Sequence, residues 1–107
     1  MNRTTSEEIQ DFVNKVAQRF KPQKIILFGS HAANQATPES DVDLLVVMEF
    51  EGRPQLQALN IRRQLKRNFP LDLIVRRPSD IQYRLAEGDF FLKDIIENGR
   101  VLYERAG

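Results

Sequence analysis

Two aspartates separated by a single residue, Asp41 and Asp43, stand at the start of an apolar run. Side chains at positions i and i+2 of a strand point to one face, so these carboxylates would project together from backbone positions roughly 7 Å apart. Two like charges held this close repel each other unless a cation neutralises them. Oxygen-only ligands favour Mg²⁺ or Mn²⁺ over zinc. The spacing therefore predicts a divalent-metal site.

A glycine–serine pair, Gly29 and Ser30, precedes Asp41 with ten residues in between. It follows a strand-like apolar run, at the point where the chain is expected to turn into a short helix. Glycine lets the backbone approach a ligand closely, serine adds a hydroxyl donor, and a helix N-terminus presents free N–H groups to an anion. The pair therefore predicts a turn that grips phosphate.

A third carboxylate, Asp72, interrupts the apolar run 71–75. If that strand lies beside the strand that carries Asp41 and Asp43, three carboxylates meet and can hold two metal ions. Two such ions would activate an attacking hydroxyl and stabilise the leaving oxygen. The combination of a phosphate-binding turn with these three carboxylates indicates phosphoryl or nucleotidyl transfer.

The elements that must position these residues follow from apolar periodicity and from glycine and proline breaks. Their order predicts a small α/β layer fold with three principal strands, in one domain spanning 1–107. Ser6 is expected to cap the first helix and Asp89 the last, and Leu56, Leu59, Ile61 and Leu65 to form the inner stripe of the helix 55–67. Helices are predicted at 6–20, 31–36, 55–67, 78–86 and 90–98, and strands at 24–28, 42–47, 71–75 and, as a short edge strand, 101–103.

The composition narrows the class of protein. Sixteen basic and 15 acidic residues nearly balance over the 107 residues, but the segment 53–77 has seven basic residues and one acidic residue. That segment is either a solvated helix face or a surface for an anionic partner, and direct nucleic-acid binding is disfavoured because no aromatic-rich stacking surface accompanies the charge.

The absence of cysteine excludes disulfides. No apolar run approaches membrane-span length and the N-terminus lacks a signal peptide's apolar centre, so we expect a cytoplasmic protein that does not enter a membrane.

Two further groups are open to interpretation. Arg76 and Arg77 directly follow the strand that carries Asp72, so one of them could approach the active cleft. The apolar residues of the last helix are interpreted as core packing in preference to a partner surface; they are Phe90, Phe91, Ile95 and Ile96.

The residues Phe28–Ala32 through Ser40–Leu44 resemble the Gly-Ser-x10-Asp-x-Asp signature of the minimal nucleotidyltransferases (MNT) of the DNA polymerase β-type superfamily. The chain is especially similar to the MNT antitoxins of HEPN–MNT toxin–antitoxin pairs. Leu71–Val75 matches their third-carboxylate strand, and the segment 95–104 resembles their C-terminus. The resemblance covers nearly the whole chain and implies an α+β fold, with a mixed sheet of three main strands and a short edge strand flanked by helices.

The same resemblance implies a metal-dependent reaction. Asp41 and Asp43 would ligate both of two Mg²⁺ ions, with Mn²⁺ as an alternative, and Asp72 would hold the metal at the attacking hydroxyl and help to deprotonate it. AMP would pass from ATP to a tyrosine of a HEPN ribonuclease, which is thereby silenced, and pyrophosphate would leave. A runner-up is an antitoxin that only covers its toxin with little or no catalysis, because so small a domain offers few contacts to an acceptor.

Phosphate binding is implied for Gly29 and Ser30, at the β- and γ-phosphates of ATP. One departure concerns the next residue, because many relatives carry arginine there and this chain carries His31. Loss of a permanent charge would weaken triphosphate binding, although His31 can still donate a hydrogen bond to the nucleotide.

Overall fold

The computed structural model describes residues 4–106, so residues 1–3 and 107 of the expected domain lie outside the described range. Within that range the chain forms four helices and four strands. In chain order they are α1 (Ser6–Phe20), β1 (Lys24–Phe28), β2 (Val42–Val47), α2 (Pro54–Gln64), β3 (Leu71–Arg76), α3 (Pro78–Ala86), α4 (Phe90–Asn98) and β4 (Arg100–Glu104).

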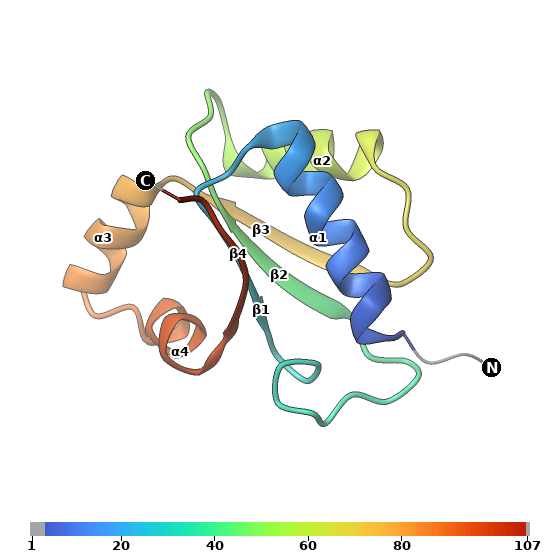
Figure 1. Cartoon of the computed structure of the whole chain (residues 1–107). Coiled ribbons are helices and arrows are strands. Elements are labelled where there is room, and N and C mark those ends of the chain that lie inside the picture. The colour runs from blue at the N-terminus through green and yellow to red at the C-terminus, as the bar shows by residue number, and fades with distance from the viewer. Residues whose placement is uncertain (1–3, 107) are drawn as a thin grey trace.

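The strands form one mixed sheet in the order β3-β2-β1-β4. β1 runs antiparallel to β2 and to β4, whereas β2 and β3 are parallel and are joined through α2, as a parallel pair requires. The sheet lies between two helix layers, with α1 and α2 on one side and α3 and α4 on the other (Figure 1). The mixed α+β sheet and its edge strand are thus confirmed.

Each face of the sheet has its own apolar cluster, because alternate residues of the inner strands point to opposite sides. Burial on both faces explains why β2 appears in the sequence as an unbroken apolar run after its acidic start. On the side of α1 and α2 the cluster includes Phe12, Val13, Val16, Val42, Leu44, Val46, Ile61 and Leu73. On the side of α3 and α4 it consists of Ile26, Leu45, Val47, Ile81, Leu92 and Ile95.

The cap of α1 differs from the prediction. Thr5 is the N-cap in place of Ser6: its hydroxyl accepts a hydrogen bond from the backbone N–H of Glu8 at 3.1 Å, and the Glu8 carboxylate accepts one from the backbone N–H of Thr5 at 3.0 Å. This reciprocal capping box satisfies two free donors at once, which a cap at Ser6 would not do. At α4 the predicted cap is confirmed, since the Asp89 carboxylate accepts from the N–H of Leu92 at 3.0 Å.

The segment 31–36, predicted as a short helix, is instead a series of turns. The backbone N–H of Ala33 donates to the Gly29 carbonyl at 3.1 Å, and that of Gln35 donates to the Ser30 carbonyl at 2.8 Å. Asn34 then takes a left-handed conformation with φ of +58°. A residue in that region breaks the helical ladder, so alanine content alone did not decide the local structure.

The inner stripe predicted for α2 is wrong in part. Ile61 and Leu65 are buried as expected, but Leu56 and Leu59 point to solvent and are 61% and 40% exposed. Ala58 takes their place against the core. Positions 58, 61 and 65 follow helical spacing, so the face that packs is set by these three and excludes the other two leucines.

Candidate active site

Asp43 and Asp72 stand beside each other on neighbouring strands. They are register partners in the parallel pair β2–β3, and Phe28 of β1 is the partner of Asp43 on its other side. Directly paired residues share a sheet face and adjacent strands lie about 5 Å apart. We call Phe28, Asp43 and Asp72 the site row. The row crosses the sheet on the face that α3 and α4 cover further along the strands.

Asp41 lies just before β2 and is exposed, so it belongs to the loop and not to the strand. Burial raises the pKa of Asp43, and the charges of Asp72 and then Asp41 raise it further, whereas His31 acts in the opposite direction. The strand register places Asp43 and Asp72 at one end of the sheet, where Asp41 directly precedes β2 and the loop that carries His31 follows β1.

Gly29 packs directly against Asp43. Its φ of +75° lies in the left-handed region that favours glycine. A Cβ built on this residue would overlap Oδ2 of Asp43 and lie 3.1 Å from its Cγ. Glycine is therefore needed twice here, for its backbone conformation and for the space it leaves to a carboxylate of the site row. Ser30, the next residue, is half-buried at the same turn.

The loop between β1 and β2 is held from two directions. Nε2 of His31 lies 3.5 Å from the Ser40 carbonyl oxygen, which bridges the two ends of the loop. From β4, Nη2 of Arg100 donates to the carbonyl of Ala32 at 3.1 Å. Sequence reasoning missed Arg100, because no local signal connects it to a turn 68 residues away.

A fit to a divalent cation can be judged from the donor set. As the side chains are placed, no three His, Cys, Asp or Glu residues of the range 4–106 converge closely enough to hold a metal ion. The donors nevertheless have the right chemistry, since carboxylate oxygens suit Mg²⁺. A cation would also relieve the repulsion from Asp72 and Asp41, which adds to burial in raising the pKa of Asp43. The chemistry of these carboxylate donors therefore suits a hard divalent cation.

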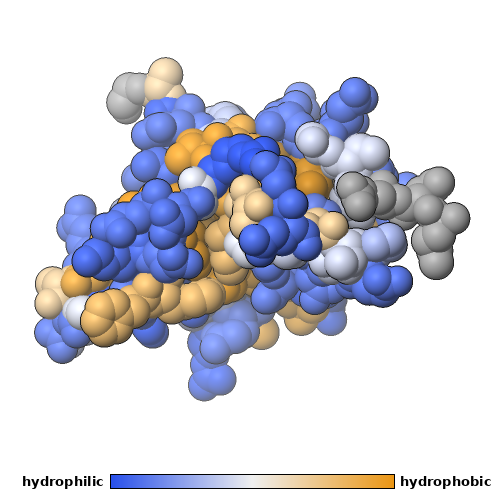
Figure 2. Space-filling model, turned by 90° about the horizontal axis from the view of Figure 1, so that it is seen from below, coloured by the Kyte–Doolittle hydropathy of each residue, from blue (hydrophilic) through white to orange (hydrophobic). Residues whose placement is uncertain are grey.

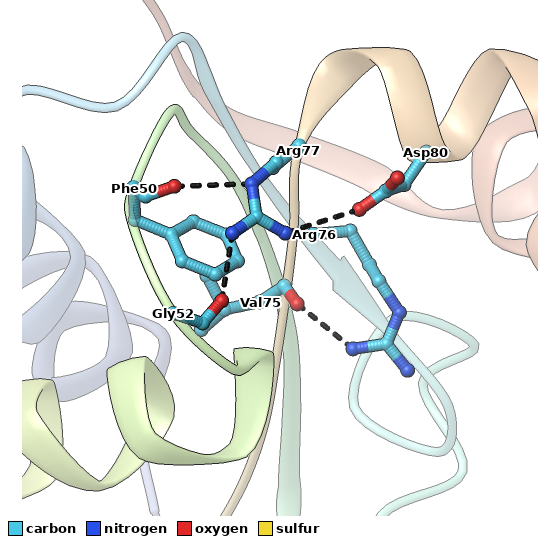
Figure 3. Close-up of polar contacts among 6 residues, drawn as sticks. All are labelled: Phe50, Gly52, Val75, Arg76, Arg77 and Asp80. Carbon is cyan, nitrogen blue, oxygen red and sulfur yellow. Dashed lines mark hydrogen bonds and ion pairs between the residues drawn. The ribbon is translucent and has the colours of Figure 1, made fainter.

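Arg77 does not approach the site row. Its guanidinium donates to the carbonyls of Phe50 and Gly52, at 3.0 and 2.7 Å, and lies 4.1 Å from the centroid of the Phe50 ring. It also contacts the carboxylate of Asp80 at 3.5 Å (Figure 3). Arg77 therefore fastens the loop between β2 and α2 to the first turn of α3.

Arg76 shares the face of Asp72 but lies at the opposite end of β3, about 13 Å along the strand. Its guanidinium donates to the Val75 carbonyl at 2.8 Å and lines a hollow with Arg84 of α3. In the same basic segment, Arg62 donates to the Leu71 carbonyl at 3.1 Å. Three arginines of this segment thus bind backbone carbonyls of the fold.

A family model described as "Polymerase beta, Nucleotidyltransferase" matches residues 7–106. The chain belongs to the polymerase beta nucleotidyltransferase family. This nucleotidyltransferase is 33% identical over 97 residues to a protein of Methanocaldococcus jannaschii named "Putative protein adenylyltransferase", a match covering 89% of this chain and 94% of the relative. A second protein of that organism with the same descriptive name is 39% identical over 54 residues, which cover 47% of this chain and 53% of the relative.

The fold of the nucleotidyltransferase is also found in a crystal structure of a "putative nucleotidyltransferase" from Sulfolobus solfataricus. The TM-score is 0.64 at 20% sequence identity, with 92% of this chain and 79% of the other covered. The family predicted from the Gly-Ser and Asp-x-Asp motifs is thus confirmed, whereas the pairing with a HEPN toxin stays a prediction. In the part of the chain that the structure describes, no helix is long and apolar enough to cross a bilayer.

Proposed function

We propose that this nucleotidyltransferase is a single-domain antitoxin that transfers AMP from ATP to a tyrosine of a HEPN ribonuclease in the cytoplasm. The observation that carries the proposal is the alignment of Asp43 with Asp72 on one side and its contact with Gly29 on the other. The names of the two relatives from Methanocaldococcus jannaschii support adenylylation of a protein. The tyrosine and the HEPN partner come from the resemblance to MNT antitoxins.

The carboxylates of Asp41, Asp43 and Asp72 would hold two Mg²⁺ ions, with Mn²⁺ as an alternative. When bound, the ions would supply a hydroxyl of lowered pKa and a stabilised leaving pyrophosphate. The pairing of Asp43 with Asp72 on adjacent strands supports this assignment, because two carboxylates held side by side repel each other unless a cation neutralises them.

Phosphate binding is assigned to the turn after β1. Gly29 has no side chain to keep an anion away from the backbone, and the Ser30 hydroxyl can donate a hydrogen bond. His31 replaces the arginine of many relatives. Because a neutral imidazole has one N–H donor, His31 would exchange its contact with the Ser40 carbonyl oxygen for a hydrogen bond to a phosphate oxygen. These three residues would bind the β- and γ-phosphates of ATP.

The transfer itself is an exchange at the α-phosphorus of ATP. The tyrosine oxygen forms a bond to this phosphorus, the bond from it to the bridging oxygen breaks, and pyrophosphate leaves with the electron pair. The phenolic proton passes to the carboxylate of Asp72, which is exposed and can return it to water. The products are a tyrosine–AMP phosphodiester and pyrophosphate.

Labelled ATP provides the test. Incubated with Mg²⁺ and a purified HEPN toxin, the wild-type protein should label the toxin, and the double variant Asp41→Asn, Asp43→Asn should not. Asp11→Asn removes an exposed carboxylate from α1 and serves as the matched control, which should label like wild type. Labelling that survives the double variant would refute the assignment.

A second candidate function, inhibition by direct binding, is favoured by apolar side chains on the surface. The prediction that the last helix packs into the core holds for Ile95 but is wrong for Phe90, Phe91 and Ile96, which are 82%, 56% and 43% exposed. Apolar side chains form a band on the side of α3 and α4 when the molecule is seen from below (Figure 2). Exposed apolar patches of this kind mark protein-binding surfaces.

Co-expression with the toxin separates the two functions. If the Asp41→Asn, Asp43→Asn variant protects cells as well as wild type does, binding is the function. If protection is lost while the variant still co-purifies with the toxin, the chemistry is required and the apolar surface only brings the acceptor into place.

A further inference from the structure

Phe28, the residue at the β1 end of the site row, contacts a second aromatic ring, that of Phe91. Phe28 belongs to the row and is followed directly by Gly29, and the Phe91 ring of α4 lies against it with ring centroids 5.7 Å apart and planes at 86°. Phe28 is half-buried and packs on the apolar cluster beneath α3 and α4. Phe91 therefore contacts the cross-strand neighbour of Asp43, on the sheet face from which Asp43 and Asp72 project.

Phe91 is 56% exposed even though it touches Phe28. The helix that carries it is anchored on both sides of this residue: Asp89 caps the first turn, and Leu92 and Ile95 are buried against the sheet. The ring is thus held in place while much of its surface stays open to a ligand. Such a surface is already organised before a ligand arrives, which lowers the entropic cost of binding.

We propose that Phe91 is the stacking surface for the base of the nucleotide, positioned by its edge-to-face contact with Phe28. This inference rests on the proposed function, which sets the phosphates at Gly29 and Ser30 and the reacting phosphorus beside Asp43.

The proposal also fixes the direction of the bound nucleotide. Gly29 and Ser30 directly follow Phe28, so phosphates held there would lie just past the end of β1, and the base would extend back over the sheet face on which Phe91 contacts Phe28. Across the row, the side of Asp72 must remain open to the acceptor hydroxyl. The other direction leads to α4, where Phe91 presents an aromatic surface.

Stacking has a consequence for specificity. Every nucleobase has a π-face, so an aromatic platform binds all of them and discriminates weakly. Phe91 should therefore strengthen binding of ATP, GTP and CTP alike. Any preference for ATP must come from other groups.

The test compares a ligand that has a base with one that lacks it. Calorimetric titration in Mg²⁺ would measure the affinity of the isolated protein for ATP and for inorganic tripolyphosphate. Phe91→Ala should weaken ATP binding about 5- to 10-fold, the lower part of the range for one stacked base, and should leave tripolyphosphate unaffected. Phe91→Tyr should restore the affinity for ATP. Phe90→Ala, at the adjacent and more exposed ring, is the matched control and should change neither ligand.

The outcomes divide cleanly. Unchanged ATP affinity in Phe91→Ala overturns the inference, as does an equal loss for both ligands, which would mean a disturbed phosphate site. Equal binding of ATP and tripolyphosphate by the wild type would also overturn it, because the base would then contribute nothing, but the proposed function would stand. Failure of the wild type to bind either ligand would sink the proposed function and the inference with it. If Phe91→Ala instead loses only its affinity for the HEPN toxin, the ring belongs to the protein interface.

Discussion

Replacing Gly29 by alanine should impose two separate costs, one on the backbone and one on the site row. The backbone cost arises because φ is +75° at this residue, and a side chain in the left-handed region costs about 1–2 kcal/mol. For a domain of this size each kcal/mol lowers Tm by about 4–8 °C, so a fall of about 4–16 °C is expected from this source. The second cost is the overlap of the new Cβ with Oδ2 of Asp43, which only a movement of that carboxylate can relieve.

Gly88→Ala is the matched control. Gly88 also has a left-handed backbone, with φ of +86°, but a Cβ built there meets nothing within 4 Å. Both variants should therefore lose comparable stability from backbone strain, and only Gly29→Ala should displace Asp43.

Thermal melts with and without Mg²⁺ and ATP read out the difference. A ligand at 100 times its Kd stabilises the folded protein by about 2.7 kcal/mol. Gly88→Ala should show the same ligand-induced rise in Tm as wild type, whereas Gly29→Ala should lose most of it. If Gly29→Ala kept the full rise, the close contact between Gly29 and Asp43 would not matter for ligand binding, and the reasoning would be refuted.

Three further outcomes follow from described contacts. Arg77→Ala should lower the free energy of unfolding in urea by about 1.5–3 kcal/mol, because it removes a charged donor from two backbone carbonyls; Arg84→Ala, which loses an exposed ion pair, should change it by under about 1 kcal/mol. Without ligand, Asp43→Asn should be at least as stable as wild type at pH 7, because burial and then the charges of Asp72 and Asp41 raise the pKa of Asp43 in the folded protein. The ionised Asp43 therefore destabilises the wild-type protein increasingly as pH rises above 3.8, the ordinary pKa of an aspartate. Tm values measured over a pH series should differ between the two proteins at pH 7 and converge below pH 3.8. Gly99→Ala should cost about 1–3 kcal/mol in the same urea titration, because its Cβ would overlap the Ile95 carbonyl and a methyl of Ile26, and an unchanged midpoint would contradict the packing.

The strands and most helices could be predicted because their residues carry local signals. β2 is apolar on both faces after its acidic start, and α3 and α4 begin and end at proline, aspartate and glycine positions that restrict the backbone. The alignment of Asp43 with Asp72 could be predicted only on the condition that their two strands are neighbours in the sheet. No local pattern says which strands are neighbours, and the parallel pairing of β2 with β3 is visible only in the folded sheet.

Long-range contacts account for what the sequence did not reveal. The helix α4 presents one stripe to the sheet, occupied by Leu92 and Ile95, so the other apolar residues of the helix remain outside. Apolar content alone does not show which stripe will pack. The contact of Phe91 with Phe28 depends on the same docking, and so does the link from Arg100 to the turn after β1.

The alternation along β3 protects the chemistry from misalignment. Leu71, Leu73 and Val75 are buried beneath α1 and α2, and Asp72 emerges between them on the opposite side. A shift of this strand by one residue would bury the Asp72 carboxylate in the apolar core and move the three aliphatic side chains to the opposite face of the sheet. Such a register is strongly destabilised. Buried aliphatic residues on the other side of the strand therefore keep Asp72 in register with Asp43. Substitutions on the outer surface can alter which partner binds without shifting these two aspartates.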